Sequence, residues 1–205
     1  ETRVLVVDAD TFRDRGGDLA AKASSLKHVF TLGPANYGID LLAAAETGGT
    51  ATPRSLAEPD DIATLNYTGG TTGVPKAAML THRNIFANVI QTELWHFRDA
   101  DRGRERFLMV IPYFHIYGLT VGLMLGLWIN ARQIQVSKYD VELVLGAIRD
   151  YRPTYFPSVP TIFVSLLNHP RLHEFHIDRV KTYNSGSAPL SMEVLERFER
   201  VANVP

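Results

Sequence analysis

The chain of 205 residues contains no cysteine, and its acidic and basic side chains nearly cancel. Without thiols it can form neither disulfides nor thiolate metal sites, which fits a reducing compartment. The 21 Lys and Arg residues against 22 Asp and Glu residues leave a formal net charge of −1. Nucleic-acid binders usually carry a basic excess, so we expect no nucleic-acid partner. These absences lead us to expect a cytoplasmic protein, with peripheral contact to a membrane left open.

Charged residues are also missing from residues 107–131, which contain no Asp, Glu, Lys or Arg. A stretch of this length could span a bilayer. Pro112, His115 and Gly118 interrupt it, however, and residues 107–111 are typical of a strand. We therefore expect a buried strand, a loop and a core helix here rather than a membrane span.

The remaining composition, 45% hydrophobic and 21% charged, is that of an ordinary soluble globular protein. Apolar runs of strand length alternate with helical periodicity, which predicts an α/β fold with a largely parallel sheet flanked by helices. Residues 47–59, rich in Gly, Thr, Pro and Ala, predict a surface linker. The expected strands are residues 3–8, 27–32, 107–111, 155–156 and 180–183. The expected helices are residues 17–25, 38–46, 82–97, 141–148 after an N-capping Asp140, 160–167 and 191–201.

Residues 67–76 combine three glycines, three threonines and one lysine between two apolar runs. Glycines let the backbone turn its N–H groups toward an anion, while the hydroxyls and the lysine add further donors. This composition predicts a loop that holds polyphosphate. The common NTPase loop is excluded, because Val74 and Pro75 separate Gly73 from Lys76 and Ala77 stands where Ser or Thr is required. The alternative is a Gly/Thr-rich hairpin without a ligand.

The order Tyr-Thr-Gly-Gly-Thr-Thr-Gly-Val-Pro-Lys over residues 67–76, followed by Met-Leu-Thr-His-Arg-Asn over residues 79–84, resembles the adenylate-forming superfamily. This superfamily includes acyl-CoA synthetases, luciferases and adenylation domains. The Thr-Gly-Gly-Thr-Thr-Gly variant looks most like long-chain fatty-acid–CoA ligases. The resemblance is strong from residue 61 onward and weak before residue 59. Ala77 departs from it, because a glycine usually follows the loop lysine.

A second motif, Ile-Pro-Tyr-Phe-His-Ile-Tyr-Gly over residues 111–118, places His115 among aromatic side chains. Taken alone, His115 would more often be a satisfied core histidine than a functional one. The segment resembles the Pro-x-x-His-x-x-Gly motif of the same superfamily, which implies a position near the α-phosphate and the incoming acid. Some long-chain members carry a tryptophan gate four residues after this histidine. Leu119 occupies that position here, which puts such a gate in doubt.

A third motif, Asn-Ser-Gly-Ser-Ala-Pro-Leu over residues 184–190, follows an expected strand and precedes an expected helix. Small residues let a flat ring approach the backbone closely. The segment resembles the family's Gly-Ala-Pro-Leu turn beside the adenine and acyl pocket, although a plain strand–helix turn explains it equally well. The resemblance implies nucleotide contacts at Gly186, Ser187, Ala188 and Pro189.

The resemblance implies a two-step reaction with ATP, Mg²⁺ and coenzyme A. A carboxylic acid, expected to be a fatty acid, attacks the α-phosphate and gives acyl-AMP and pyrophosphate; coenzyme A then displaces AMP. Catalytic roles are implied for His115 and Lys76, and contact with magnesium for Thr68. The residues implied to hold the phosphates are Thr68, Gly69, Gly70, Thr71, Thr72, Gly73 and Lys76.

Two alternatives stay open: adenylation of an aryl, short-chain or amino acid, including luciferase-like chemistry, and an inactive nucleotide-binding scaffold. The family's Tyr-Gly-x-Thr-Glu and Ser/Thr-Gly-Asp motifs and its C-terminal lysine domain are not found in this sequence. We therefore expect residues 1–205 to form the central part of the large N-terminal domain, inactive by itself. His169, His173 and His176 have a spacing that could gather metal ligands, but Pro170 argues against one continuous helix.

Overall fold

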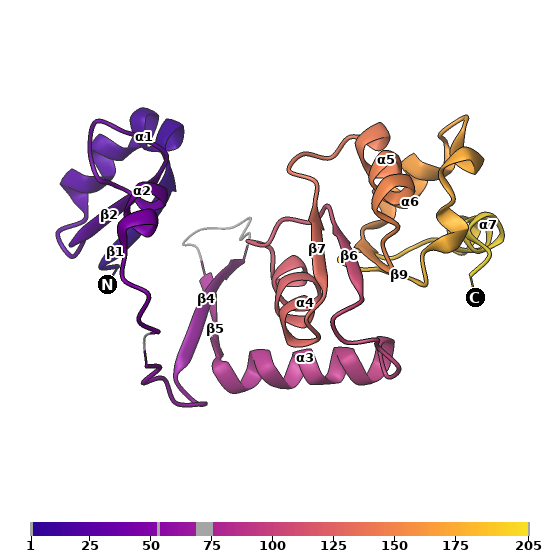
Figure 1. Cartoon of the computed structure of the whole chain (residues 1–205), viewed down its shortest axis with the longest axis horizontal. Coiled ribbons are helices and arrows are strands. Elements are labelled where there is room, and N and C mark those ends of the chain that lie inside the picture. Colours follow the sequence, from indigo (N-terminus) through magenta and orange to yellow (C-terminus); the bar gives the residue numbers. More distant parts are fainter. Residues whose placement is uncertain (1, 53, 69–75, 205) are drawn as a thin grey trace. The chain divides into compact units, whose positions relative to one another are not determined.

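The computed structural model describes residues 2–52, 54–68 and 76–204, without the side chains of residues 17–21 and 68. The chain divides into two compact units, Glu1–Leu56 and Ala57–Pro205. The division falls within residues 47–59, and the described residues among 48–61 contain no helix or strand. Figure 1 shows the course of the chain through both units.

The first unit is a parallel three-stranded sheet of order β1-β2-β3 with two helices. The strands expected at residues 3–8 and 27–32 are confirmed. Its elements are β1 (Val4–Asp8), α1 (Ala9–Lys22), β2 (His28–Leu32), β3 (Ile39–Asp40) and α2 (Leu41–Thr47).

Two helix starts in this unit differ from the sequence prediction. The helix expected from residue 17 begins at Ala9, because the carboxylate of Asp8 accepts the Thr11 N–H at 2.8 Å and caps the first turn. The helix expected from residue 38 begins at Leu41, because residues 39 and 40 form β3 and pair with β2. In both cases an aspartate at the end of a strand serves as the cap.

The second unit contains an antiparallel hairpin and a parallel four-stranded sheet of order β7-β6-β8-β9. The predicted α/β fold with largely parallel strands flanked by helices is thus confirmed. The strands are β4 (Ile62–Thr68), β5 (Lys76–Thr81), β6 (Arg106–Met109), β7 (Arg132–Gln135), β8 (Tyr155–Ser158) and β9 (Thr182–Ser185). The helices are α3 (His82–His96), the π-helix η1 (Gly118–Met124), α4 (Leu125–Trp128), α5 (Val141–Tyr151), α6 (Pro160–Leu167), the 3₁₀-helices η2 (Leu172–Phe175) and η3 (Ile177–Arg179), and α7 (Met192–Ala202).

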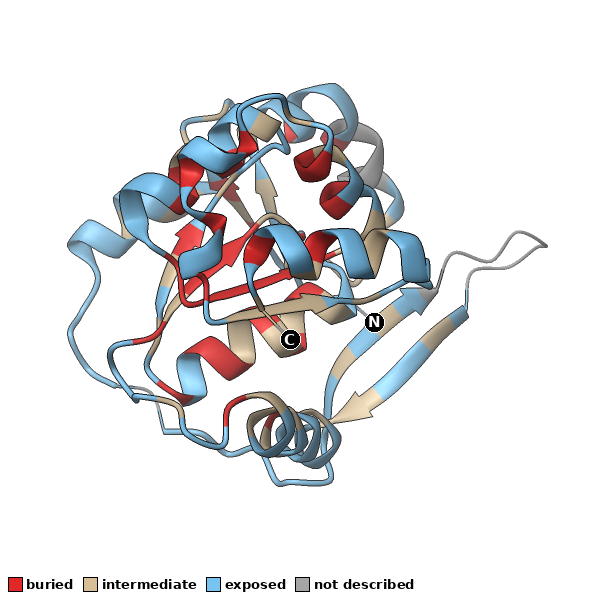
Figure 2. Cartoon of the chain, turned by 90° about the vertical axis from the view of Figure 1, so that its right-hand side faces the viewer, coloured by how far each residue is buried: buried red, intermediate tan, exposed pale blue. Residues whose placement is uncertain are grey.

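Alternate residues of the central strands enter separate hydrophobic cores on the two faces of this sheet. Leu108 and Phe156 pack with the apolar sides of α5, α6 and α7. Phe107 and Tyr155 pack with residues of α3 and α4. Burial on both faces is what a parallel sheet requires, and in Figure 2 the buried residues gather on the strands and on the helix sides that meet them.

A stripe of glycines explains how η1 and α4 lie close to the sheet. A Cβ atom added at Gly122 would lie 2.1 Å from Met109 Cε, and one added at Gly126 would lie 1.7 Å from Gln133 Nε2. Residues 118–128 thus form the expected core helix. None of the helices in the described part of the chain is both long and apolar enough to cross a membrane.

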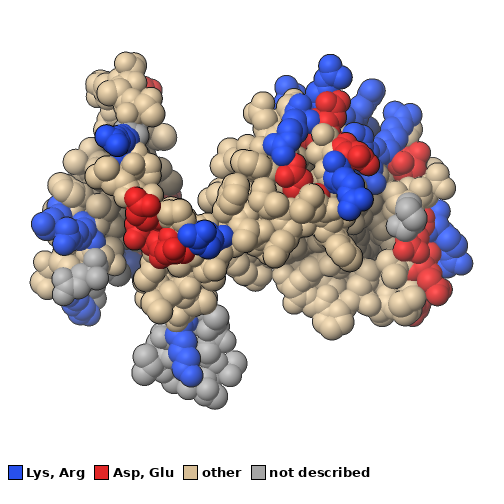
Figure 3. Space-filling view, turned by 90° about the horizontal axis from the view of Figure 1, so that it is seen from below, with Lys and Arg blue, Asp and Glu red and all other residues tan. Residues whose placement is uncertain are grey.

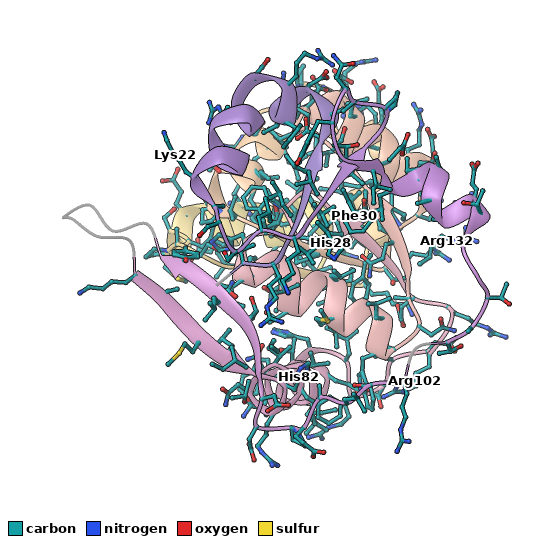
Figure 4. The ribbon with its side chains drawn as sticks, turned by 90° about the vertical axis from the view of Figure 1, so that its left-hand side faces the viewer. Lys22, His28, Phe30, His82, Arg102 and Arg132 are labelled. Atoms are coloured by element: carbon teal, nitrogen blue, oxygen red, sulfur yellow. The ribbon has the colours of Figure 1, made fainter. Side chains whose placement is uncertain are left out.

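Helices α3 and α4 are tied together through Glu93. Its carboxylate accepts the indole N–H of Trp128 at 2.6 Å and pairs with Arg102. The Arg102 guanidinium also lies 5.1 Å from the centre of the Trp128 ring, a cation–π contact. Figure 4 labels Arg102 among the side chains of the second unit. Viewed from the side of α3, the middle of the second unit carries few charged side chains (Figure 3). Glu93 thus joins α3 to α4 through Trp128 and to the following loop through Arg102.

Glu105 is a buried anchor of the second unit, with 3% of its surface exposed. Burial by itself would raise the pKa of Glu105. Hydrogen bonds from the Thr154 hydroxyl and the Asp101 N–H, and the charge of Lys181, outweigh burial and hold this pKa below its usual value. The Lys181 ammonium lies 3.3 Å from the carboxylate. Glu105 therefore stays ionised inside the fold at neutral pH.

Candidate functional site

The expected phosphate loop lies between two paired strands. Thr68, the last residue of β4, pairs with Lys76, the first residue of β5. Gly69, Gly70, Thr71, Thr72 and Gly73 lie outside the described residues, so their roles stay predictions. Lys76 is exposed.

Strand β5 leads directly into α3 and fixes the direction of that helix. The Thr81 hydroxyl accepts the Asn84 N–H at 3.2 Å, and the Asn84 side chain accepts the Thr81 N–H at 3.1 Å. This reciprocal capping box satisfies two backbone donors at the helix start. It also sets the first turns of α3, whose residues Asn84, Ile85 and Asn88 line a cavity.

That cavity has a volume of about 640 Å³ and is formed by segments far apart in the sequence. It lies within the range of about 300–1,000 Å³ that is typical of small-molecule sites. His115 and Ser187, from two of the three motifs, both line it, whereas Lys76 does not. The lining residues are Leu80, Asn84, Ile85, Asn88, His115, Ile116, Tyr117, Thr120, Val121 and Ser187.

His115 is an exposed residue of the loop before η1, which contradicts its interpretation as a core histidine. The loop is held by the His115 N–H, which donates to the Pro112 carbonyl at 3.1 Å, and by the Leu119 N–H, which donates to the His115 carbonyl at 2.9 Å. The Tyr117 N–H donates to His115 Nδ1 at 3.2 Å. In the neutral ring the proton therefore lies on Nε2, which can donate to an anionic oxygen.

The turn after β9 brings its small residues against Tyr117. The Gly186 N–H donates to the Ser158 carbonyl at 3.0 Å, and Ser187 adopts a left-handed conformation with φ of 67°. A Cβ atom added at Gly186 would lie 2.6 Å from Tyr117 Cζ. The turn thus requires glycine at residue 186 and directs Ser187 to the cavity. Gly186, Ala188 and Pro189 are not among the described lining residues.

Tyr117 and Asn184 are site residues that the sequence did not single out. The Tyr117 hydroxyl donates to the side-chain oxygen of Asn184 and lies 3.2 Å from its carbonyl oxygen. Burial raises the pKa of Tyr117 well above its ordinary value, so the phenol stays protonated at neutral pH. The spacing from His115 could have drawn attention to Tyr117. Asn184 is the first residue of the third motif, but the motif assigned it no contact.

The described residues bring no group of three or more His, Cys, Asp or Glu side chains together for a metal ion. His169 instead lies 2.8 Å from the carboxylate of Glu142. The side chain of Thr68 is not described, so its contact with magnesium stays a prediction.

The chain is similar to known proteins in sequence and in structure. The family model described as AMP-binding enzyme matches residues 1–204. A long-chain-fatty-acid–CoA ligase of Bacillus subtilis (strain 168) is 43% identical over 141 residues, which are 69% of this chain and 25% of that protein. A 4-coumarate–CoA ligase of Humulus lupulus is 34% identical over 151 residues, covering 71% of this chain and 27% of that protein.

Among solved structures, ATP-bound MatB from Rhodopseudomonas palustris superimposes with a TM-score of 0.81 at 31% identity. The match covers 97% of this chain and 38% of that one. The chain thus spans about a quarter of the length of the two curated relatives, both of which are CoA ligases.

Proposed function

We propose that this chain, which belongs to the AMP-binding enzyme family, forms the ATP- and acid-binding part of a fatty-acid–CoA ligase. The observation that carries the proposal is the cavity in which His115 and Ser187, from two separate motifs, meet a wall of aliphatic side chains. The aliphatic residues of this wall are Leu80, Ile85, Ile116 and Val121. Polar groups beside an aliphatic wall fit an acid with a hydrocarbon tail.

In the first step, a carboxylate oxygen of the acid attacks the α-phosphorus of ATP. The new oxygen–phosphorus bond forms as the bond to pyrophosphate breaks, and pyrophosphate leaves with the electron pair. In the second step, the thiolate of coenzyme A attacks the acyl carbon. The carbon–sulfur bond forms as the bond from that carbon to the phosphate oxygen breaks, and AMP leaves with the electron pair. Negative charge therefore grows first on the pyrophosphate and must be stabilised there.

We assign different oxygens to His115 and Lys76. The Nε2–H of His115 would donate to the carboxylate or to an α-phosphate oxygen. Lys76 stands four residues before the cavity-lining Leu80, about 13 Å along β5 at the usual rise per residue. It would therefore pair with the β- and γ-phosphates, together with the backbone of residues 68–73. The adenine side of the nucleotide would contact residues 186–189.

Exchange of pyrophosphate into ATP by the full-length protein tests the substrate class. The panel compares a long-chain fatty acid, 4-coumarate, a short-chain acid and an amino acid. We expect the highest kcat/KM with the fatty acid, because the cavity wall is aliphatic. A higher value with 4-coumarate would favour the aryl alternative, in which the Tyr117 ring stacks on the substrate. Exchange with none of the acids, in protein that binds ATP, would favour a scaffold.

Lys76→Ala tests the phosphate role separately. Loss of one such charge-stabilising donor typically lowers kcat about 100- to 1,000-fold. We expect a loss of this size in pyrophosphate exchange, with Lys138→Ala, another exposed lysine, as the matched control. Unchanged exchange in Lys76→Ala would contradict the assignment.

A further inference from the structure

Three side chains from separate segments form a hydrogen-bonded network beside the cavity. The Tyr117 hydroxyl donates to Asn184 Oδ1, and Asn184 Nδ2 donates to His96 Nε2 at 3.0 Å. His96 is the last residue of α3, Asn184 lies in β9, and Tyr117 precedes η1. We call this the His96–Asn184–Tyr117 network; its partners lie 67 and 88 residues apart in the sequence.

Both the oxygen and the nitrogen of the Asn184 side-chain amide make a hydrogen bond in this network. Its oxygen accepts from Tyr117 and its nitrogen donates to His96. An N–H donor requires an unprotonated Nε2 on His96. Burial lowers the pKa of His96 and so favours this neutral ring. His96 thus accepts a hydrogen bond that Asn184 Nδ2 would otherwise have to donate to water.

Only one member of the network reaches the cavity. Tyr117 lines it, and the Tyr117 ring packs against Gly186, next to the lining residue Ser187. His96 and Asn184 are not among the described lining residues. His96 can therefore influence a ligand only through Asn184 and Tyr117.

We propose that His96 is a positioning residue for the acid-binding cavity: it orients Asn184, which holds the Tyr117 ring against the Gly186 turn. Naming the acid as the affected ligand rests on the proposed function, whereas the restraint on Tyr117 does not. The wall formed by Tyr117 and Ser187 keeps its shape only while this network is intact. Its loss weakens binding of the acid more than binding of ATP, because Tyr117 itself lines the cavity proposed for the acid.

The kinetic test uses the full-length protein and three variants. His96→Leu removes the acceptor, His96→Gln keeps an acceptor oxygen, and Gln91→Leu is a control at an exposed position of the same helix. One intramolecular hydrogen bond is worth about a two- to tenfold change in an equilibrium. We expect His96→Leu to raise the KM for the acid about three- to tenfold and the KM for ATP by a smaller factor. His96→Gln and Gln91→Leu should stay within twofold for both substrates.

Amide hydrogen exchange of residues 113–119, measured without substrates, tests the restraint itself. We expect faster exchange in His96→Leu and wild-type rates in His96→Gln. Tyr117→Phe, which removes only the hydroxyl, should raise the KM for the acid as His96→Leu does. The double variant should raise this KM no further than either single variant. The proposal would be overturned if either His96→Leu or Tyr117→Phe left both the exchange rates and the KM for the acid unchanged. If the wild type adenylates none of the acids, the proposed function fails, while hydrogen exchange still decides the role of His96.

Discussion

Gly186→Ala probes the contact between the turn after β9 and the cavity wall. The added Cβ atom would lie 2.6, 2.9 and 3.0 Å from Tyr117 Cζ, Cε1 and Cε2. Ordinary contacts begin at 3.4 Å, so the ring or the turn must move by about 0.8 Å. The ring is held by Asn184, and the turn is held by its hydrogen bond to the Ser158 carbonyl. The backbone of Gly186 itself is not left-handed, so the penalty is purely steric.

Overpacking of this kind typically costs about 1–3 kcal/mol, which corresponds to about a 5- to 150-fold change in an equilibrium constant. Because the displaced ring lines the cavity, we expect Gly186→Ala to raise the KM for the acid at least about fivefold. The melting temperature of the full-length protein should fall as well, since the strain is present without substrate.

Pyrophosphate exchange and a thermal melt measure both effects. The matched control is Gly146→Ala in α5, where an added Cβ atom meets no heavy atom within 4 Å. Alanine is the better helix former by about 1 kcal/mol, so this control should melt slightly higher. In a Tyr117→Leu background the effect of Gly186→Ala should nearly vanish. Wild-type behaviour of Gly186→Ala, or an equal loss in the Tyr117→Leu background, would refute the steric explanation.

Three further substitutions test the anchors of the fold. Glu93→Ala should lower the melting temperature, because it leaves the Trp128 indole N–H without its acceptor; the effect should shrink in a Trp128→Phe background. Asp140→Ala removes the oxygen that accepts the Leu143 N–H at 3.0 Å, and a lower urea midpoint should report a loss of about 1 kcal/mol. The pKa of Glu105 is lowered in the folded state, so its ionised carboxylate stabilises the fold. This stabilisation is complete at pH values above the pKa of an unfolded glutamate, about 4.3, and disappears as the pH falls through the lower pKa of the folded state. Melting temperatures should therefore fall more steeply below about pH 4.3 in the wild type than in Glu105→Gln, and equal slopes would contradict this role.

Helices with a clear local start were predicted well. Pro160 opens α6 as expected, and α7 follows the capping residue Ser191, where the helix was expected to begin. Proline at a first turn and a serine cap act within three residues, so they are readable without tertiary information. The start of α1 was wrong because Asp8 ends β1 and caps the helix at once. Strand β7 was not predicted, since Ile134 is its one buried residue and its neighbours are polar.

For the site, the three motifs marked His115, the loop of residues 67–76 and the turn of residues 184–190. The structure brings His115 and Ser187 to one cavity and places Lys76 at the opposite end of β5 from Leu80. Local spacing could indicate the chemistry of each segment. It could not indicate which segments share a cavity, because that depends on the strand order β7-β6-β8-β9.

Periodicity, caps and ordered motifs were enough to predict the α/β class, most of the helices and strands, and the family. The contacts of Asn184 with His96 and with Tyr117 exist only in the packed fold. Hydrogen bonds between residues so far apart form only after parallel strands and α3 have packed on a common core. Their partners are set by that packing, and no neighbour in the sequence encodes them.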